Sequence, residues 1–257
     1  MGYVIALAGK GGTGKTTIAA LIVRTLQEKK LGSVLAVDAD PFSNLAQALG
    51  CPPAQSIGEI LDEISRHPER VPSGMGKDHF IEYQVHAAIQ EAEGFDVLTM
   101  GRPEGPGCYC YVNNALRNVM QKLIKDYDYI VIDNEAGLEH LSRRTTRVAD
   151  ALVVVSDATV VGLRAARRIN ELAQELDIKI RKRLLLLNRL EGAVDKTILQ
   201  DMGLEHIGAI PMDAQISKAS LDGNSLMHVS ADTPGLITLQ KIGETIWQKS
   251  SYRSGLA

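Results

Sequence analysis

Residues 9–16 read GKGGTGKT, which places glycines, two lysines and a threonine at the spacing of a phosphate-binding loop. Glycines let backbone N–H groups approach phosphate oxygens, and a helix that begins here adds partial positive charge. Lys15 is expected to reach the β- and γ-phosphates of a nucleotide, and the Thr16 hydroxyl to join a magnesium ion. The expected nucleotide contacts in the loop are Gly9, Lys10, Gly11, Gly12, Thr13, Gly14, Lys15, Thr16 and Thr17.

Acidic residues follow two of the apolar, strand-like runs further along the chain. Asp38 and Asp40 come after the run 34–37, and Asp133 comes after the run 129–132. Because the carboxyl ends of parallel strands meet at one edge of a sheet, we expect these carboxylates to lie beside the loop. There Asp40 would orient the attacking water, while Asp38 and Asp133 would belong to the magnesium shell. A lone aspartate at a strand end is often only a helix cap or turn residue, and that alternative stays open. The expected catalytic residues are Lys10, Lys15 and Asp40.

The base of the nucleotide would lie further along the same edge. Asn188 ends the run 184–187 and is placed to hydrogen-bond an adenine edge, while Pro211 follows the run 207–210 and could line the same face. A plain turn role explains each residue equally well. The sequence therefore leaves both interpretations open.

Two of the three cysteines form a Cys-x-Cys pair, Cys108 and Cys110. In an intracellular chain this spacing indicates metal binding or redox chemistry rather than a structural disulfide. Two thiolates supply half of a tetrahedral site, and a two-fold dimer would bring four together on its axis. A helical pattern at 112–123 follows, so the thiols would lie at a helix N-terminus, where thiolate is favoured. The alternative is a pair of ordinary cysteines in a turn, and Cys51 is interpreted as structural.

Such a site needs a sheet that brings several loops to one edge. Apolar runs alternate with helical patterns along the chain, and the runs are continuously apolar, as strands buried on both faces should be. We predict an α/β fold, a doubly wound and mostly parallel sheet of about seven strands flanked by helices. The predicted strands are 3–8, 34–37, 97–100, 129–132, 151–155, 184–187 and 207–210.

The chain is interpreted as one domain, 1–257. Proline, glycine and charge interrupt the alternation between the second and third strands, which predicts a helical insertion with a mobile loop at about 51–94. The segment 233–247 has apolar residues on one face and is predicted to be a closing helix.

The chain has 257 residues, of which 45% are hydrophobic and 23% charged, with a net charge of −3. This composition suits a sizeable α/β domain with a large core. Apolar runs stay short of the about eighteen residues that span a bilayer, and the N-terminus enters a strand at once, so we expect a cytoplasmic protein without a membrane partner. We also expect no nucleic-acid partner, because the charge is nearly neutral and short basic clusters are typical of solvated helix faces.

The chain resembles the deviant-P-loop ATPases, the class of nitrogenase iron protein, MinD-like cell-division and partition ATPases, and metal-cluster assembly factors. The resemblance covers about 1–211 and is carried by Lys10, Lys15, Asp38, Asp40 and Asp133. In that class the lysine matched by Lys10 reaches the partner's phosphates in a nucleotide-sandwich dimer. The resemblance therefore implies a homodimer formed with ATP and Mg²⁺. A cation supplied in trans would stabilise the transferring phosphate and make hydrolysis depend on assembly.

Within that class, the Cys-x-Cys pair and the segments 133–137 and 137–141 look like CooC-type nickel-insertion ATPases, which act in maturation of carbon monoxide dehydrogenase. The resemblance implies a metallochaperone dimer, promoted by nucleotide, metal or both, that binds one Ni²⁺ or Zn²⁺ through Cys108 and Cys110 of both chains. Hydrolysis would be coupled to delivery to carbon monoxide dehydrogenase or, in a close branch, to acetyl-CoA synthase. Asn134 and Glu135 stand where many relatives have smaller or apolar residues.

Two rival functions remain open from the sequence. A reductase similar to nitrogenase iron protein would hold a [4Fe–4S] cluster, but that class uses two widely separated cysteines per chain. A partition-type positioning ATPase would bind DNA or membrane, and such proteins usually carry a basic face or a basic amphipathic terminal helix. Here the end of the chain carries only Lys241, Lys249 and Arg253, with Glu244 among them.

Overall fold

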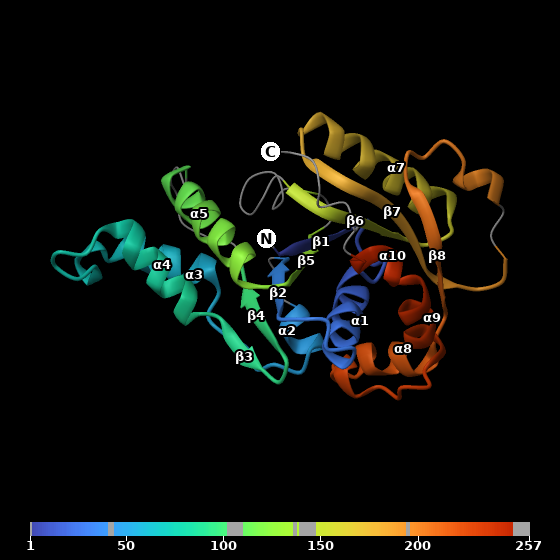
Figure 1. Ribbon diagram of the computed structural model, residues 1–257, viewed down its shortest axis with the longest axis horizontal. Coiled ribbons are helices and arrows are strands. Elements are labelled where there is room, and N and C mark those ends of the chain that lie inside the picture. The colour runs from blue at the N-terminus through green and yellow to red at the C-terminus, as the bar shows by residue number, and fades with distance from the viewer. Residues whose placement is uncertain are drawn as a thin grey trace.

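A single sheet of eight strands lies at the centre of the described part of the chain (Figure 1). The computed structural model describes residues 2–40, 44–101, 110–135, 138, 148–193 and 196–248, with the backbone alone at 110–117 and 196. The strand order is β3-β4-β2-β5-β1-β6-β7-β8, and each neighbouring pair is parallel except β3 and β4. The strands are β1 (Tyr3–Ala8), β2 (Val34–Ala39), β3 (Gln90–Ala92), β4 (Phe95–Thr99), β5 (Tyr129–Asn134), β6 (Val148–Ser156), β7 (Lys179–Leu190) and β8 (Glu205–Pro211).

The structure confirms the predicted doubly wound α/β fold, and each of the seven predicted runs falls on a strand, with Met100 of the run 97–100 lying one residue past the end of β4. The eighth strand, β3, is not predicted from the sequence because its three residues, Gln-Glu-Ala, contain no apolar run. It forms as an antiparallel edge strand joined to β4 by the turn Glu93-Gly94, in which Gly94 has a φ of 83°. A two-residue turn of this kind selects glycine for its left-handed conformation. The sequence therefore indicates the turn, although it does not indicate the strand.

Helices cover both faces of the sheet because the strands are apolar on both sides. In β1, Tyr3, Ile5 and Leu7 pack toward α1, whereas the residues between them pack toward α5 and α7. One face carries α1 (Lys15–Glu28), α2 (Leu45–Ala48), α8 (Ala214–Leu221), α9 (Pro234–Ile242) and α10 (Glu244–Trp247). The other carries α3 (Ile57–Arg66), α4 (Lys77–Ala87), α5 (Cys110–Asp126) and α7 (Val160–Glu175). Short 3₁₀ turns are η1 (Pro68–Arg70), η2 (Lys196–Leu199) and η3 (Leu226–His228).

Helix α1 anchors the loop that precedes it. The helix follows Gly14, whose φ of 88° lies in the left-handed region, and its apolar residues Ile18, Leu21, Ile22 and Leu26 are fully buried. Burial of that many large side chains fixes α1 against the sheet, at about 1.5–3 kcal/mol for each. The amino end of α1 is thereby held at the carboxyl edge of β1.

The predicted insertion at 51–94 contains α3, η1, α4 and β3, and its helices extend beyond the β3–β4 edge of the sheet (Figure 1). Helix α3 starts with a capping box, in which Ser56 and Glu59 satisfy each other's backbone N–H groups. Helix α4 is tied to α5 by an ion pair in which Lys122 Nζ lies 2.6 Å from Glu82 Oε1. Apolar residues of α3, α4 and α5 share one core, so the insertion packs on α5.

The predicted closing helix at 233–247 is wrong as a single helix, because it divides at Gly243 into α9 and α10. A β-carbon at Gly243 would lie 1.9 Å from the ring of Trp247, so the indole folds back over the glycine at the break. The helical periodicity is still correct in outline, since Leu236, Leu239 and Ile246 are fully buried. Among the described helices, none is both long and apolar enough to cross a bilayer.

Candidate functional site

The loop 9–14 joins β1 to α1 and is packed between neighbouring strands at two of its glycines. A β-carbon at Gly9 would lie 2.3 Å from the carbonyl oxygen of Val155 in β6. A β-carbon at Gly14 would lie 2.4 Å from Asn188 Nδ2 at the end of β7. Both positions therefore require glycine for close backbone approach.

The two glycines between them face open space instead. A β-carbon at Gly11 or Gly12 would meet no described atom within 4 Å. The first turn of α1 has neither a side-chain cap nor an acidic residue. No capping side chain therefore accepts hydrogen bonds from its backbone N–H groups. Together with the helix dipole, these N–H groups favour an anion at this point.

The two lysines of the loop occupy different environments. Lys15 is buried, with 8% of its surface exposed, and its Nζ lies 3.4 Å from the carbonyl oxygen of Lys10. The same carbonyl accepts a 2.9 Å hydrogen bond from the Thr13 hydroxyl. The Lys10 side chain itself is exposed at the outside of the loop. Lys15 is thus held under the loop, whereas Lys10 is available to something outside the chain.

Asp133 lies at the end of β5 with 1% of its surface exposed. Neither of its carboxylate oxygens has a partner in hydrogen-bond geometry among the described residues. Burial is the main reason that the pKa of Asp133 is raised to about 7. The nearby Thr16 hydroxyl and Lys15 ammonium oppose this rise in the pKa, and the charges of Asp38 and Asp40 add to it.

Asp38 stands opposite Asp133 in the register of β2 and β5. It is fully buried, and burial raises its pKa to about 6. Its oxygens accept hydrogen bonds from the backbone N–H groups of Asp40 at 3.2 Å and Leu45 at 2.8 Å. Asp38 therefore shapes the turn that carries Asp40, and its predicted place in a metal shell stays a prediction.

The residues at this edge fit a magnesium ion. An orphaned, buried carboxylate is costly without a cation, and Asp133 has two unpaired oxygens beside the Thr16 hydroxyl. Magnesium in nucleotide sites takes one or two protein oxygens and completes its shell with water and phosphate. Thr16 and Asp133 would hold the ion, which would neutralise phosphate charge when bound.

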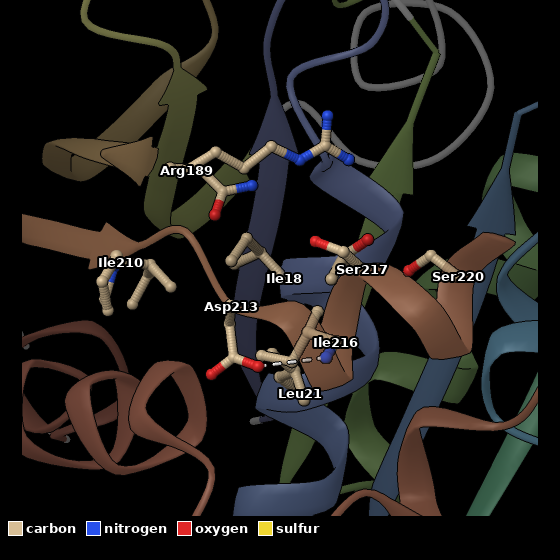
Figure 2. Close-up of a pocket in the computed structure, with 11 residues that line it drawn as sticks. Ile18, Leu21, Arg189, Ile210, Asp213, Ile216, Ser217 and Ser220 are labelled. Carbon is tan, nitrogen blue, oxygen red and sulfur yellow. Dashed lines mark hydrogen bonds between the residues drawn. The ribbon is translucent and has the colours of Figure 1, made fainter. Parts of the chain in front are cut away.

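A groove between α1 and α8 continues from the loop along the same edge (Figure 2). Its walls include Thr17, Ile18 and Leu21 of α1, Ile216, Ser217 and Ser220 of α8 with its N-cap Asp213, and Asn188, Arg189, Ile210 and Pro211 from the ends of β7 and β8. The structure thus brings the two residues predicted to contact a base, Asn188 and Pro211, into one groove. A mixed wall of aliphatic side chains and a few polar groups is the usual composition of such sites.

Three residues of this edge have roles that the sequence does not indicate. Asn188 Nδ2 donates a buried 2.8 Å hydrogen bond to the Thr13 carbonyl, so this amide braces the phosphate loop. Arg189 is absent from the sequence-based site, and its Nη1 donates to the Gly12 carbonyl at 3.2 Å. Asp213 caps α8, accepting from Gln215 and Ile216, and also accepts from Gly235.

Only part of the predicted cysteine site can be placed. Cys108 lies outside the described residues, and Cys110 is the first residue of α5, with its side chain not described. The expected position of the pair at a helix N-terminus therefore stays a prediction for Cys108. Cys51 is half-buried, and burial raises the pKa of its thiol. Among the described residues, no group of three or more His, Cys, Asp or Glu side chains could hold a metal ion.

Comparison with known proteins decides the family. A family model described as an AAA domain matches residues 2–186. The ATP-binding protein MJ0685 of Methanocaldococcus jannaschii is 40% identical over 251 residues, which is 96% of this chain and 99% of the relative. The chain belongs to the AAA domain family of deviant-P-loop ATPases.

Two further similarities describe this ATPase more closely. The carbon monoxide dehydrogenase accessory protein CooC of Rhodospirillum rubrum is 32% identical over 242 residues, covering 88% of the ATPase and 90% of CooC. The septum site-determining protein MinD of Pyrococcus horikoshii OT3, complexed with Mg-ADP, covers the whole of both chains with a TM-score of 0.71 and 22% identity. The second similarity establishes the fold of the ATPase.

Proposed function

We propose that this ATPase is a metallochaperone that couples ATP hydrolysis to nickel insertion into carbon monoxide dehydrogenase. Its cargo is one Ni²⁺ or Zn²⁺, held by Cys108 and Cys110 of two chains. The observation that carries the proposal is the 32% identity to CooC over 88% of the chain. The sequence adds a Cys-x-Cys pair, whose second cysteine, Cys110, is the first residue of α5. Four thiolates suit either ion, because soft sulfur ligands accept both.

In this proposal ATP binds at the loop, with residues 9–17 on the phosphates and Asn188 and Pro211 on the base. Lys15 supplies positive charge to the β- and γ-phosphates, and Asp40 orients the attacking water. Thr16, Asp38 and Asp133 form the magnesium shell. Support comes from the open space over Gly11 and Gly12 and from the unpaired oxygens of Asp133.

Helix α5 gives the proposal a physical connection between cargo and nucleotide. The helix begins at Cys110 and ends at Asp126, and β5, which carries Asp133, begins at Tyr129. Val119, Met120 and Leu123 of α5 are buried in the core that it shares with α3 and α4. A well-packed helix moves as a rigid body, so a displacement at its amino end is transmitted toward the strand that carries Asp133.

We further infer a homodimer that closes around ATP. Lys10 is exposed beside the loop and would reach the phosphates bound to the partner. To drive such a dimer from mostly open to mostly closed, ATP must bind the closed form about 10⁴-fold more tightly, or about 5.5 kcal/mol. Several charge-assisted contacts to a triphosphate supply free energy of that order. Closure would change the separation of the two Cys-x-Cys pairs and so release the cargo.

The test is titration of the reduced, metal-free protein with Ni²⁺ and with Zn²⁺, followed by size-exclusion chromatography and elemental analysis. We expect one ion per two chains in the wild type and none in the Cys108→Ser/Cys110→Ser double variant. Cys51→Ser is the matched control, because Cys51 is a half-buried thiol outside the proposed site, and it should bind metal normally. If the double variant binds metal as the wild type does, the proposed metallochaperone function is wrong and only the ATPase assignment stands.

The same preparation discriminates the iron–sulfur alternative. The light-independent protochlorophyllide reductase iron–sulfur ATP-binding protein of Chlorobium phaeovibrioides is 25% identical over 99% of this chain, which favours that second candidate. Anaerobically purified protein would then be brown and contain iron and sulfide. Colourless protein that binds nickel or zinc through the Cys-x-Cys pair supports cargo delivery instead. With metal binding established, stimulation of hydrolysis by carbon monoxide dehydrogenase or by acetyl-CoA synthase identifies the client.

A further inference from the structure

Arg189 has a backbone conformation that its residue type rarely adopts. Its φ is 56°, in the left-handed region, where a non-glycine residue is uncommon and costs free energy. The residue lies near the end of β7, where the pairing with β8 is irregular between Leu187 and Leu190. A strained arginine of this kind persists only where the surrounding structure requires it, so its side-chain contacts matter.

Those contacts are to the phosphate loop. Arg189 Nη1 donates to the Gly12 carbonyl at 3.2 Å, next to the bond that Asn188 Nδ2 makes with the Thr13 carbonyl at 2.8 Å. The end of β7 thus supplies two consecutive donors to two consecutive loop carbonyls. Figure 2 shows the Arg189 side chain extending from β7 toward the start of α1.

The hydrogen bond from Arg189 to the Gly12 carbonyl sets the direction in which the next N–H group of the loop points. In a planar trans peptide the C=O and the following N–H point in opposite directions. A Gly12 carbonyl drawn toward Arg189 therefore turns the Thr13 N–H away from β7. In the present structure the Thr13 N–H makes only a long hydrogen bond, 3.4 Å to the Lys10 carbonyl. It can therefore donate to another acceptor.

We propose that Arg189 is a positioning residue of the phosphate loop, which holds the Gly12 carbonyl outward and thereby presents the Thr13 N–H to the phosphates of ATP. The arginine acts through a neutral carbonyl and not by touching phosphate or base. This role concerns nucleotide binding alone and does not depend on metal delivery. A guanidinium suits this role because it is planar and rigid, so its N–H groups donate in a fixed direction.

The first experiment separates the side chain from the strained backbone. Arg189→Gly removes the guanidinium and relieves the left-handed conformation, whereas Arg189→Ala removes only the guanidinium. Lys30→Gly is the matched control, because Lys30 has a φ of 51° and lies after α1 at the end away from the loop. We expect both glycine variants to keep or raise the melting temperature. Only the Arg189 variants should raise the KM for ATP, by about tenfold, with kcat changed less than about twofold.

The second experiment tests whether the effect passes through the loop. Competition binding is measured with ATP, GTP and inorganic tripolyphosphate on wild type and Arg189→Gly, each with magnesium. The proposal predicts the same fold-loss for all three, because they share the phosphate contacts of the loop. A loss confined to ATP would overturn it, since Arg189 would then be a base contact in the groove.

Salt dependence separates positioning from direct charge attraction. A hydrogen bond to a neutral carbonyl is screened little by salt, so the fold-loss in Arg189→Gly should be the same in low and in high potassium chloride. A loss that shrinks as salt is added would mean that the guanidinium attracts phosphate directly, and the positioning role would be wrong. Unchanged KM in Arg189→Gly, or a KM increase that merely follows a lower melting temperature, would also overturn the proposal.

Discussion

Asp38 and Asp133 occupy the same register position of the neighbouring strands β2 and β5, so two buried carboxyl groups lie side by side beneath the phosphate loop. They differ in their partners, because Asp38 accepts two backbone hydrogen bonds whereas Asp133 has two oxygens without a partner among the described residues. Two adjacent buried carboxylates repel each other and are costly to ionise together. The edge of the sheet is therefore arranged for a cation that a nucleotide brings with it.

Asp133→Asn should stabilise the nucleotide-free protein near pH 8 and abolish its stabilisation by ATP and magnesium. The substitution removes a buried charge whose cost is on the order of 2–4 kcal/mol when ionised. Chemical denaturation with and without Mg-ATP measures both effects. Asp150→Asn is the control, because that carboxylate already accepts from Val4 N at 2.9 Å and lies 3.0 Å from Arg181 Nη1. Asp150→Asn should lose stability in both conditions. If Asp133→Asn also lost stability without nucleotide, Asp133 would not be a carboxylate that depends on a bound cation.

Stability of the nucleotide-free protein should fall as pH rises between about 4 and 7. In that window unfolded chains release the protons of Asp38 and Asp133, while the folded chain retains them because burial raises these pKa values to about 6 and about 7. The folded state binds more protons there, so its advantage is present at the acidic end and is lost above about pH 7. Denaturation midpoints measured across this range should lose the contribution of Asp133 in Asp133→Asn, and the slope that remains below about pH 6 should be that of Asp38.

Asn188→Ala should lower both stability and ATP affinity, because it leaves the buried Thr13 carbonyl without its donor. We expect a loss of about 1–3 kcal/mol in the free energy of unfolding. Asn170→Ala is a matched control, since Asn170 is also a buried amide that donates to two backbone carbonyls, those of Met202 and Gly203. It should lose similar stability yet bind ATP, measured by calorimetry, as the wild type does. Equal loss of affinity in the two variants would show a general effect of destabilisation.

The sheet is predictable because its strands are buried on both faces and therefore appear as continuous apolar runs, of which residues 151–155 in β6 are an example. The phosphate loop is predictable because its glycines have a fixed spacing. By contrast, β3 depends on an edge pairing with β4, and the break at Gly243 depends on where Trp247 packs. Both are tertiary effects that local periodicity does not encode.

The functional site, like the fold, has some features that the sequence predicts and others that it does not. Asp38 and Asp133 can be found because each lies at the end of a strand, and strand ends share an edge. Arg189 is missed because its role arises from a left-handed backbone and an irregular β7–β8 register, neither of which has a sequence signature in an arginine. Asn188 is found for its position, but no local pattern indicates that its amide donates to Thr13.

Gly11→Ala should fold like the wild type and bind ATP poorly. Its β-carbon would meet no described atom within 4 Å, so the protein alone accommodates the methyl group, while the space it enters is the one assigned to phosphate. Gly14→Ala should instead be destabilised, since its φ is 88° and its β-carbon would lie 2.4 Å from Asn188 Nδ2. Thermal melts and nucleotide titration of the two variants make the comparison. Normal ATP affinity in Gly11→Ala would place the phosphates elsewhere.

Lys10→Ala and Lys15→Ala should fail in different ways. Lys15 is buried beneath its own loop, so its loss should abolish ATP binding, whereas Lys10 is exposed and its loss should spare binding but prevent dimer closure and hydrolysis. An equimolar mixture of the two inactive variants provides the sharp test. The Lys15→Ala chain still carries Lys10 and can offer it to ATP held by the Lys10→Ala chain, so hydrolysis should reappear in the mixture. A mixture of well-folded variants that stays inactive would mean that Lys10 does not act across a dimer.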